Sequence, residues 1–234
     1  MEHILFAAAE IEELTCAQEA FKKFEKELAN KIMVDFMLTG VGTTSTCYQL
    51  TKALLKAQAS GNPYTLIMDL GIAGSFDLAK FPIGSAAVIA EEHAGNLGFE
   101  TETGFKTLFD YNVWKPNEHP YTDCALKRSP LPYKHLEKKL NEYPSAVGVT
   151  VQTVTCDPLK VTEMRNRFNS EIESMEGSAF YYVALQEHVP FFEIRTVSNA
   201  VGESDSKKWD SAAALRSLEN CCEDILSCLL KDVQ

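Results

Sequence analysis

The stretch that decides the fold is Val189–Asp205, "VPFFEIRTVSNAVGESD", in which an apolar run passes abruptly into polar side chains. The run "VPFFEI" has the composition of a buried strand, and Arg195, Ser198 and Asn199 follow it directly. In open α/β sheets, the carboxyl end of a strand is the place where side chains reach a bound ligand. The stretch therefore predicts an α/β fold with a pocket at Asn199.

The rest of the chain repeats this pattern, since short apolar runs alternate with longer stretches of helical period. The alternation predicts one α/β domain over residues 1–234, with a central mixed, largely parallel sheet flanked by helices. The expected strands are Ile4–Ala9, Ile32–Leu38, Thr65–Leu70, Ser85–Ala90, Ala146–Val154 and Val189–Val197. The clearest expected helices are Glu13–Ala29 and Ser211–Leu230, each with an apolar stripe for the core. Between Gly95 and Tyr143 the pattern fails, so we expect an irregular insert at about 95–143 that is functional or mobile.

Composition excludes several classes of partner. The formal charge is −11 and the basic residues are scattered, so no surface for nucleic acid is indicated. The N-terminal "MEHILFAAAEIEEL" has no basic region and too short an apolar run to span a bilayer, which predicts a cytoplasmic protein that does not bind a membrane. The seven cysteines and five histidines show no metal-ligand spacing. We therefore expect no metal, no cofactor, and cysteines that are reduced and mostly buried.

Three glycine-containing stretches follow expected strands or apolar residues: "LTGVGTTST" (38–46), "DLGIAGSF" (69–76) and "SMEGSAF" (174–180). At the carboxyl end of a parallel sheet, such turns present small residues and free backbone N–H groups to a ligand. Ordinary turn chemistry is the alternative for each. None of the three matches a Walker A or a dinucleotide fingerprint.

Two carboxylates stand near these turns. Glu12 follows the first expected strand, and Glu176 ends the stretch "IESMEG". Glu12 could simply be a first-turn helix residue favoured by the helix dipole, and Glu176 a solvated loop residue. Placed at one rim of the sheet, Glu176 could instead accept hydrogen bonds from the vicinal hydroxyls of a ribose.

In this order, the stretches resemble the purine nucleosidase and nucleoside phosphorylase family over nearly the whole chain. The matching motifs are "AAAEIEE" with Glu12, Gly40 with Gly42, "GIAG" at 71–74, Met175-Glu176-Gly177, and Arg195 with Ser198 and Asn199. Within the family, "GIAG", "GNLG", "TVQTVTC" and "TVSNAVGESD" are most similar to the subfamily that hydrolyses futalosine. Asn96, Cys156 and Ser204 depart from that subfamily's pattern.

The resemblance implies hydrolysis of the N-glycosidic bond of a 6-oxopurine nucleoside, with futalosine giving hypoxanthine and dehypoxanthine futalosine on a route to menaquinone. Glu12 would orient and deprotonate the attacking water. Glu176 would hold the ribose hydroxyls and Met175 would pack against the sugar. The residues expected to line the base are Ala73, Gly74, Val154, Thr155 and Cys156.

The resemblance also implies that Asn199 selects the purine base. Adenine-specific relatives carry Asp here, which can protonate a leaving purine, whereas the Asn amide offers one donor and one acceptor and suits a 6-oxopurine. The glycine turns contain no Arg or Lys, which favours water over phosphate as the nucleophile. The family also implies a homodimer or higher homo-oligomer.

Several alternatives stay open at this point. The chain could be a methylthioadenosine/S-adenosylhomocysteine nucleosidase, a purine nucleoside phosphorylase, or a non-catalytic nucleoside-binding protein. The aromatics of the insert could cover the mouth of the site or form a satellite core or subunit interface. Asp205 could orient the Asn199 amide or cap the next helix.

Overall fold

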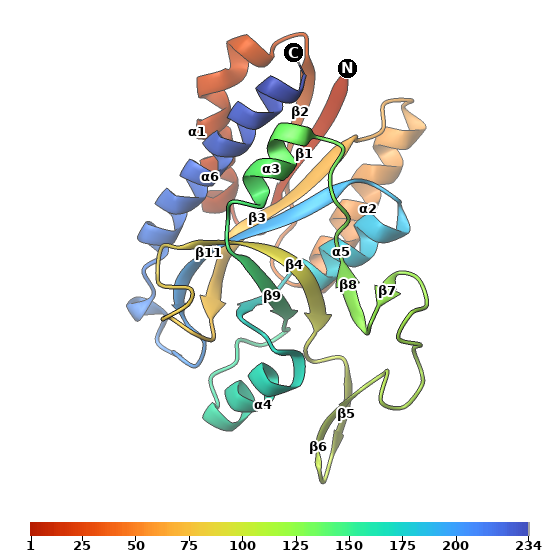
Figure 1. Cartoon of the computed structure of the whole chain (residues 1–234), viewed down its shortest axis with the longest axis vertical. Helices are drawn as coiled ribbons and strands as arrows, with labels where there is room; N and C mark the ends of the chain where they lie inside the picture. The colour runs from red at the N-terminus through yellow and green to blue at the C-terminus, as the bar shows by residue number, and fades with distance from the viewer. Residues whose placement is uncertain (234) are drawn as a thin grey trace.

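The computed structural model describes residues 1–233, and the apolar runs of the sequence form its strands. The strands are β1 (Glu2–Ala8), β2 (Ile32–Leu38), β3 (Leu66–Ser75), β4 (Ala86–Ala94), β5 (Gly98–Thr101), β6 (Gly104–Thr107), β7 (Tyr121–Thr122), β8 (Ala125–Lys127), β9 (Ser145–Thr150), β10 (Ile172–Ser174) and β11 (Phe191–Ala200). The helices are α1 (Ile11–Leu28), α2 (Thr43–Ala59), α3 (Lys134–Leu140), α4 (Pro158–Phe168), α5 (Gly177–Gln186) and α6 (Ser211–Asp232), with a 3-10 turn η1 (Ser206–Lys208) before α6. Figure 1 shows their arrangement.

The central sheet is mixed and closes on itself. Parallel ladders join β2, β1, β3 and β11, and another parallel set joins β4, β9 and β10. Antiparallel ladders between β11 and β4 and between β10 and β3 connect the two sets into a ring of five strands. The mixed α/β class expected from the sequence is therefore correct, but the sheet is parallel only within each set.

Two features of this ring differ from the expectation. The "GIAG" stretch lies inside β3 instead of in a turn after it, because β10 and β11 pair with β3 as far as Ser75. The three-residue strand β10 was not expected, since a run of that length carries no readable period. Both features place the carboxyl end of β3 between two neighbouring strands.

Helices cover the sheet on two faces, and the side chains of β1 point alternately to one face and the other. Ile4 and Phe6 belong to the core beneath α1, α3 and α6, whereas Leu5 and Ala7 belong to the core beneath α2 and α5. In Figure 1, α1 and α6 lie side by side, and α2 and α5 lie on the opposite side of the strands. Each large apolar side chain buried in this way contributes about 1.5–3 kcal/mol to folding.

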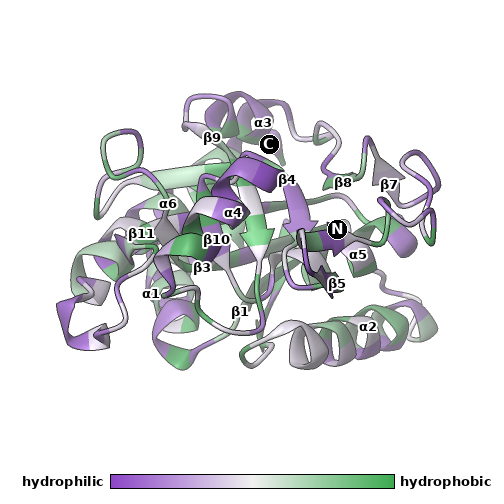
Figure 2. Cartoon of the chain, turned by 90° about the horizontal axis from the view of Figure 1, so that it is seen from below, coloured by the Kyte–Doolittle hydropathy of each residue, from purple (hydrophilic) through white to green (hydrophobic). Residues whose placement is uncertain are grey.

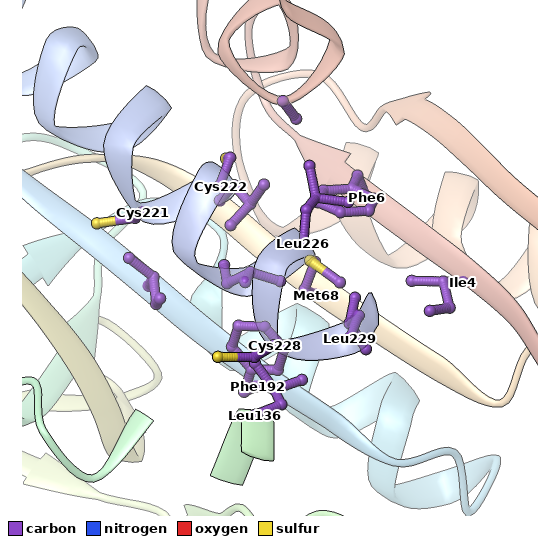
Figure 3. Packing of buried hydrophobic residues seen from close by; sticks show 14 of the residues in the cluster. Ile4, Phe6, Met68, Leu136, Phe192, Cys221, Cys222, Leu226, Cys228 and Leu229 are labelled. Carbon is purple, nitrogen blue, oxygen red and sulfur yellow. The ribbon is translucent and has the colours of Figure 1, made fainter. Parts of the chain in front are cut away.

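The cysteines behave largely as expected. Cys221, Cys222 and Cys228 on α6 are buried, and Figure 3 shows them among apolar side chains of the core. Cys16 is also buried, while Cys47, Cys124 and Cys156 are at least partly exposed, and all seven are free thiols. A buried thiol acts here as a small hydrophobic group.

The insert is more regular than its sequence suggests. It contains the hairpin of β5 and β6, which projects from the body in Figure 1, and also β7, β8 and α3. These elements span two to seven residues, too short for a periodic signal. Beyond it, α4 is largely hydrophilic (Figure 2) and buries Phe168. Within residues 1–233, no helix is both long and apolar enough to cross a membrane.

Candidate active site

A cavity of about 200 Å³, here called the acidic cavity, opens at the carboxyl end of β3 and β11. Its polar lining comes from elements far apart in the sequence. These polar residues are Glu10, Glu13, Glu173, Ser174, Glu176, Ser198 and Asn199. Apolar residues, among them Ala73, Val154, Met175 and Trp209, complete the wall. The chemistry available here is that of carboxylates and one amide.

The carboxylate that α1 contributes to the acidic cavity is Glu13, whereas Glu12, the residue expected from the sequence, does not line it. The helix starts at Ile11 with Glu10 as N-cap, so Glu13 occupies the third helical position of a capping box. Its Oε2 accepts from the backbone N–H groups of Ala9 (3.2 Å) and Glu10 (3.0 Å), and its Oε1 from Ile72 (2.8 Å). Successive helix residues are about 100° apart, so Glu12 points to solvent while Glu13 is buried.

Glu176 also lines the acidic cavity. It sits at the N-cap of α5, and its Oε1 accepts from the backbone N–H of Gly42 at 3.0 Å. Its Oε2 accepts from the backbone N–H of Met175 at 3.3 Å. The "GVG" turn and the "MEG" motif thus meet through one carboxylate that is 5% exposed.

A buried arginine joins the carboxylates beneath this cavity. Arg195 is 1% exposed, and its guanidinium donates to Asp69 through Nη2 and to Glu193 through Nε, the latter at 2.6 Å. Its Nη1 lies 3.7 Å from Oε2 of Glu176. Asp69 and Glu193 face each other directly in the β3–β11 ladder, so the arginine two residues further on can bind both.

Burial changes the protonation of this cluster. It raises the pKa of Glu13 above the usual range, although the Arg195 guanidinium opposes the shift. It likewise raises the pKa values of Asp69 and Glu193, again against the opposing charge of Arg195. One cation cannot neutralise every carboxylate around it, so the cluster retains protons to a higher pH than separate carboxylates would.

Asn199 lines the acidic cavity near the end of β11. A bulge in β11 shifts the register between Val197 and Asn199, so that Asn199 pairs with Gly74 and faces the acidic cavity. Its Oδ1 accepts from the Ser198 hydroxyl at 2.7 Å and its Nδ2 donates to the Ala200 carbonyl at 2.9 Å. These contacts hold the amide and leave one N–H and one oxygen lone pair for a ligand.

The remaining expected base-lining residues divide into three groups. Ala73, Gly74 and Val154 line the acidic cavity, as does Met175. Thr155 is buried just behind it, and its backbone N–H donates to Oε1 of Glu173 at 3.1 Å. Cys156, directly before the N-cap of α4, is exposed and does not line it.

Asp205 does not reach Asn199. Its carboxylate accepts from the backbone N–H of Lys207 at 3.1 Å and caps η1. Of the two alternatives that the sequence left open, the capping role is the one observed.

The sequence reasoning missed Glu13, Glu173 and a role for Arg195. The spacing from Glu10 to Glu13 is that of a capping box, and Glu13 is four residues before Ala17 of the predicted apolar stripe, so a signal for it existed. Glu173 carried no such signal, because its strand is three residues long.

A second, larger cavity of about 1150 Å³ lies beside the first. It is lined mainly by α2, α5 and the insert, with aromatic residues such as Tyr48, Phe109, Trp114 and Tyr182. Thr43 and Gln152, which hydrogen-bond to each other at 2.5 Å, belong to its wall, while their neighbours Val41 and Val151 line the acidic cavity. Within residues 1–233, neither cavity has a cluster of His, Cys, Asp and Glu arranged to hold a metal ion.

Comparison with known proteins assigns this architecture to a class. The chain belongs to the phosphorylase superfamily, whose family model matches residues 5–231. More particularly, it is similar to the futalosine hydrolase of Acidothermus cellulolyticus, with 30% identity over 189 residues that cover 80% of this chain and 72% of that protein. The futalosine hydrolase of Streptomyces coelicolor is 28% identical over 185 residues, covering 79% and 74%. The resemblance deduced from the motifs is thereby confirmed.

Solved structures share the fold. A methylthioadenosine/S-adenosylhomocysteine nucleosidase of Helicobacter pylori matches with a TM-score of 0.75 and 14% identity, covering 97% of both chains. Futalosine hydrolase from the same species matches with a TM-score of 0.72 and 14% identity, covering 99% of this chain and 97% of that one.

The close approach of Arg195 to Gly71 generates a prediction. A Cβ added at Gly71 would lie 2.1 Å from Nη1 of Arg195 and 3.0 Å from Oε1 of Glu13. Gly71→Ala should therefore displace the guanidinium and lower the free energy of unfolding by about 3 kcal/mol or more, the scale for breaking a buried ion pair. Urea denaturation measures this loss.

Gly61→Ala is the control, because a Cβ there meets nothing within 4 Å and only its positive φ of 75° opposes the change. It should cost roughly 1–2 kcal/mol. Equal losses in the two variants would contradict the steric role of Gly71.

Proposed function

We propose that this chain hydrolyses the N-glycosidic bond of futalosine, a 6-oxopurine nucleoside, and releases hypoxanthine. The observation that carries the proposal is the convergence of Glu13, Glu176 and Asn199 on one cavity. These residues supply a base for water, an acceptor for ribose hydroxyls and an amide for the purine. The choice of futalosine is supported by the similarity to two futalosine hydrolases.

Glu13 activates the water. Three backbone N–H groups hold its carboxylate in place, so its orientation does not depend on substrate. Its raised pKa makes it a stronger base than an exposed glutamate. The water gives its proton to Glu13 as its oxygen bonds to the anomeric carbon. The C–N bond breaks, and its electron pair leaves with hypoxanthine as an anion that then takes a proton from solvent.

Glu176 binds the ribose and stabilises the transition state. Its carboxylate accepts from the vicinal hydroxyls, while Met175 packs against the sugar. Cleavage of a glycosidic bond develops positive charge on the ribose, and the excess of buried carboxylates over the single cation Arg195 stabilises that charge. This arrangement lowers the barrier more than it tightens substrate binding.

Asn199 recognises the base. Its free N–H and oxygen lone pair meet the O6 and N7 edge of hypoxanthine, while Ala73, Gly74 and Val154 contact the ring. An amide cannot protonate the base, but hypoxanthine leaves more readily than adenine because it is the more acidic. This argues for futalosine over the adenine nucleosides methylthioadenosine and S-adenosylhomocysteine.

Water is favoured over phosphate as the nucleophile. Among the described residues that line the acidic cavity there is no Arg or Lys. Arg195 is already engaged by Asp69 and Glu193. A phosphate dianion would face several carboxylates without a free cation, which makes phosphorolysis unfavourable. A purely binding role is disfavoured because binding has no use for the water-activating Glu13.

We also propose that the enzyme works in the cytoplasm as a single-domain protein that forms a homodimer or higher homo-oligomer. Tyr48 and Leu55 of α2 and Tyr182 of α5 are 62%, 49% and 39% exposed beside the larger cavity. Such a surface is typical of a protein interface. Light scattering should therefore give a mass at least twice the 26.0 kDa of the chain. A monomer at micromolar concentration would contradict this assembly.

Product analysis tests the reaction itself. The protein incubated with futalosine should release hypoxanthine at the same rate with and without phosphate, because water is the nucleophile. Inosine and methylthioadenosine serve as comparison substrates, and chromatography identifies the base. Strict phosphate dependence would identify a phosphorylase, whereas adenine as the main product would contradict the role of Asn199.

A matched pair of variants tests which glutamate is the general base that accepts the proton of water. Glu13→Gln retains the size of the side chain but cannot accept a proton, so kcat should fall by about 10²- to 10⁴-fold with KM little changed. Glu12→Gln changes the exposed neighbour and should leave kcat within about twofold. A large loss in Glu12→Gln with none in Glu13→Gln would reverse the assignment.

A further inference from the structure

Glu173 is a buried carboxylate that the mechanism above does not use. It lies on β10, is 6% exposed and lines the acidic cavity with Asn199. Its ladder partner on β3 is Gly74, and Gly74 is also the partner of Asn199 on β11. Glu173 and Asn199 therefore flank the same glycine, with two strand spacings, about 10 Å, between their backbones.

Gly74 keeps the space between these two residues open. A Cβ added there would lie 3.3 Å from Nδ2 of Asn199 and 3.0 Å from Cγ2 of Val201. Since the middle strand contributes no side chain at this level, a flat ring can lie between the carboxylate and the amide. The strand registers thus define a slot with an acceptor at one end and an amide at the other.

Only one of the two carboxylate oxygens of Glu173 has a hydrogen-bond partner among the described residues. Oε1 accepts from the backbone N–H of Thr155 at 3.1 Å, whereas Oε2 is buried and has no hydrogen-bond partner among the described residues. A buried carboxylate oxygen without a hydrogen-bond partner costs free energy, so a ligand that brings a donor to it gains binding free energy. Burial also raises the pKa of Glu173, and a further N–H donor would stabilise its charged form.

A 6-oxopurine carries the donor that this slot lacks. Its O6 and N7 edge suits Asn199, and the adjacent ring nitrogen, N1, carries a hydrogen. Adenine has an unprotonated N1 with a lone pair, which a carboxylate repels. We propose that Glu173 accepts the N1–H of the purine and, with Asn199, makes the site specific for hypoxanthine over adenine. This inference rests on the proposed function, since it assigns the base of the same substrate.

Binding of free bases tests the inference without catalysis. By calorimetry, the wild-type protein should bind hypoxanthine about 10- to 100-fold more tightly than 1-methylhypoxanthine, which has no N1–H. Glu173→Gln should bind hypoxanthine about 10- to 100-fold more weakly and adenine more tightly, because the Gln amide can donate to N1 of adenine. Glu173→Ala, with room for a methyl group, should bind hypoxanthine and 1-methylhypoxanthine about equally.

Glu171→Gln is the matched control. Glu171 lies two residues earlier, pairs with Lys80 and does not line the acidic cavity, so its variant should bind hypoxanthine like the wild type. Unchanged hypoxanthine affinity in both Glu173 variants would overturn the role of Glu173. Because that result can occur while futalosine still yields hypoxanthine, it is distinguishable from failure of the proposed function, in which wild type would release no hypoxanthine.

Discussion

The buried guanidinium of Arg195 organises the acidic cavity. It bonds Asp69 on β3 and Glu193 on its own strand and lies against Glu176, so a single side chain joins two strands to the start of α5. Removing one partner of such a buried pair costs about 3–5 kcal/mol, because the other charge is left without compensation. The position of Glu176 therefore depends in part on the arginine.

Glycines make this arrangement possible by their lack of a side chain. Gly71 leaves room for the guanidinium beside β3, and Gly74 leaves the slot between Glu173 and Asn199. The glycines of the "GIAG" motif thus lie inside strand β3, where they leave space for neighbouring side chains, and they do not form the turn expected from the sequence. Polar side chains can lie close to β3 at these two positions because the glycines have no side chain to exclude them.

Closure of the sheet explains why the site is acidic. The antiparallel joins place β10 next to β3, which adds Glu173 to the other carboxylates of the acidic cavity, Glu10, Glu13 and Glu176. Burial raises the pKa values of Asp69 and Glu193, and the neighbouring carboxylates add to the effect while Arg195 opposes it. An excess of negative charge suits a reaction that builds positive charge on a sugar, and it opposes an anionic nucleophile.

From the sequence alone came the α/β class, the order of the main strands, the family and the region of the site around Glu176 and Asn199, because these follow from local periodicity and ordered motifs. Tertiary structure decided the rest. Adjacent Glu12 and Glu13 differ by one helix step, and only the start of α1 determines which one is buried. Asp69 and Arg195 are 126 residues apart, and Glu173 meets Asn199 only across β3. Contacts between distant strands depend on register and closure, which no local pattern encodes.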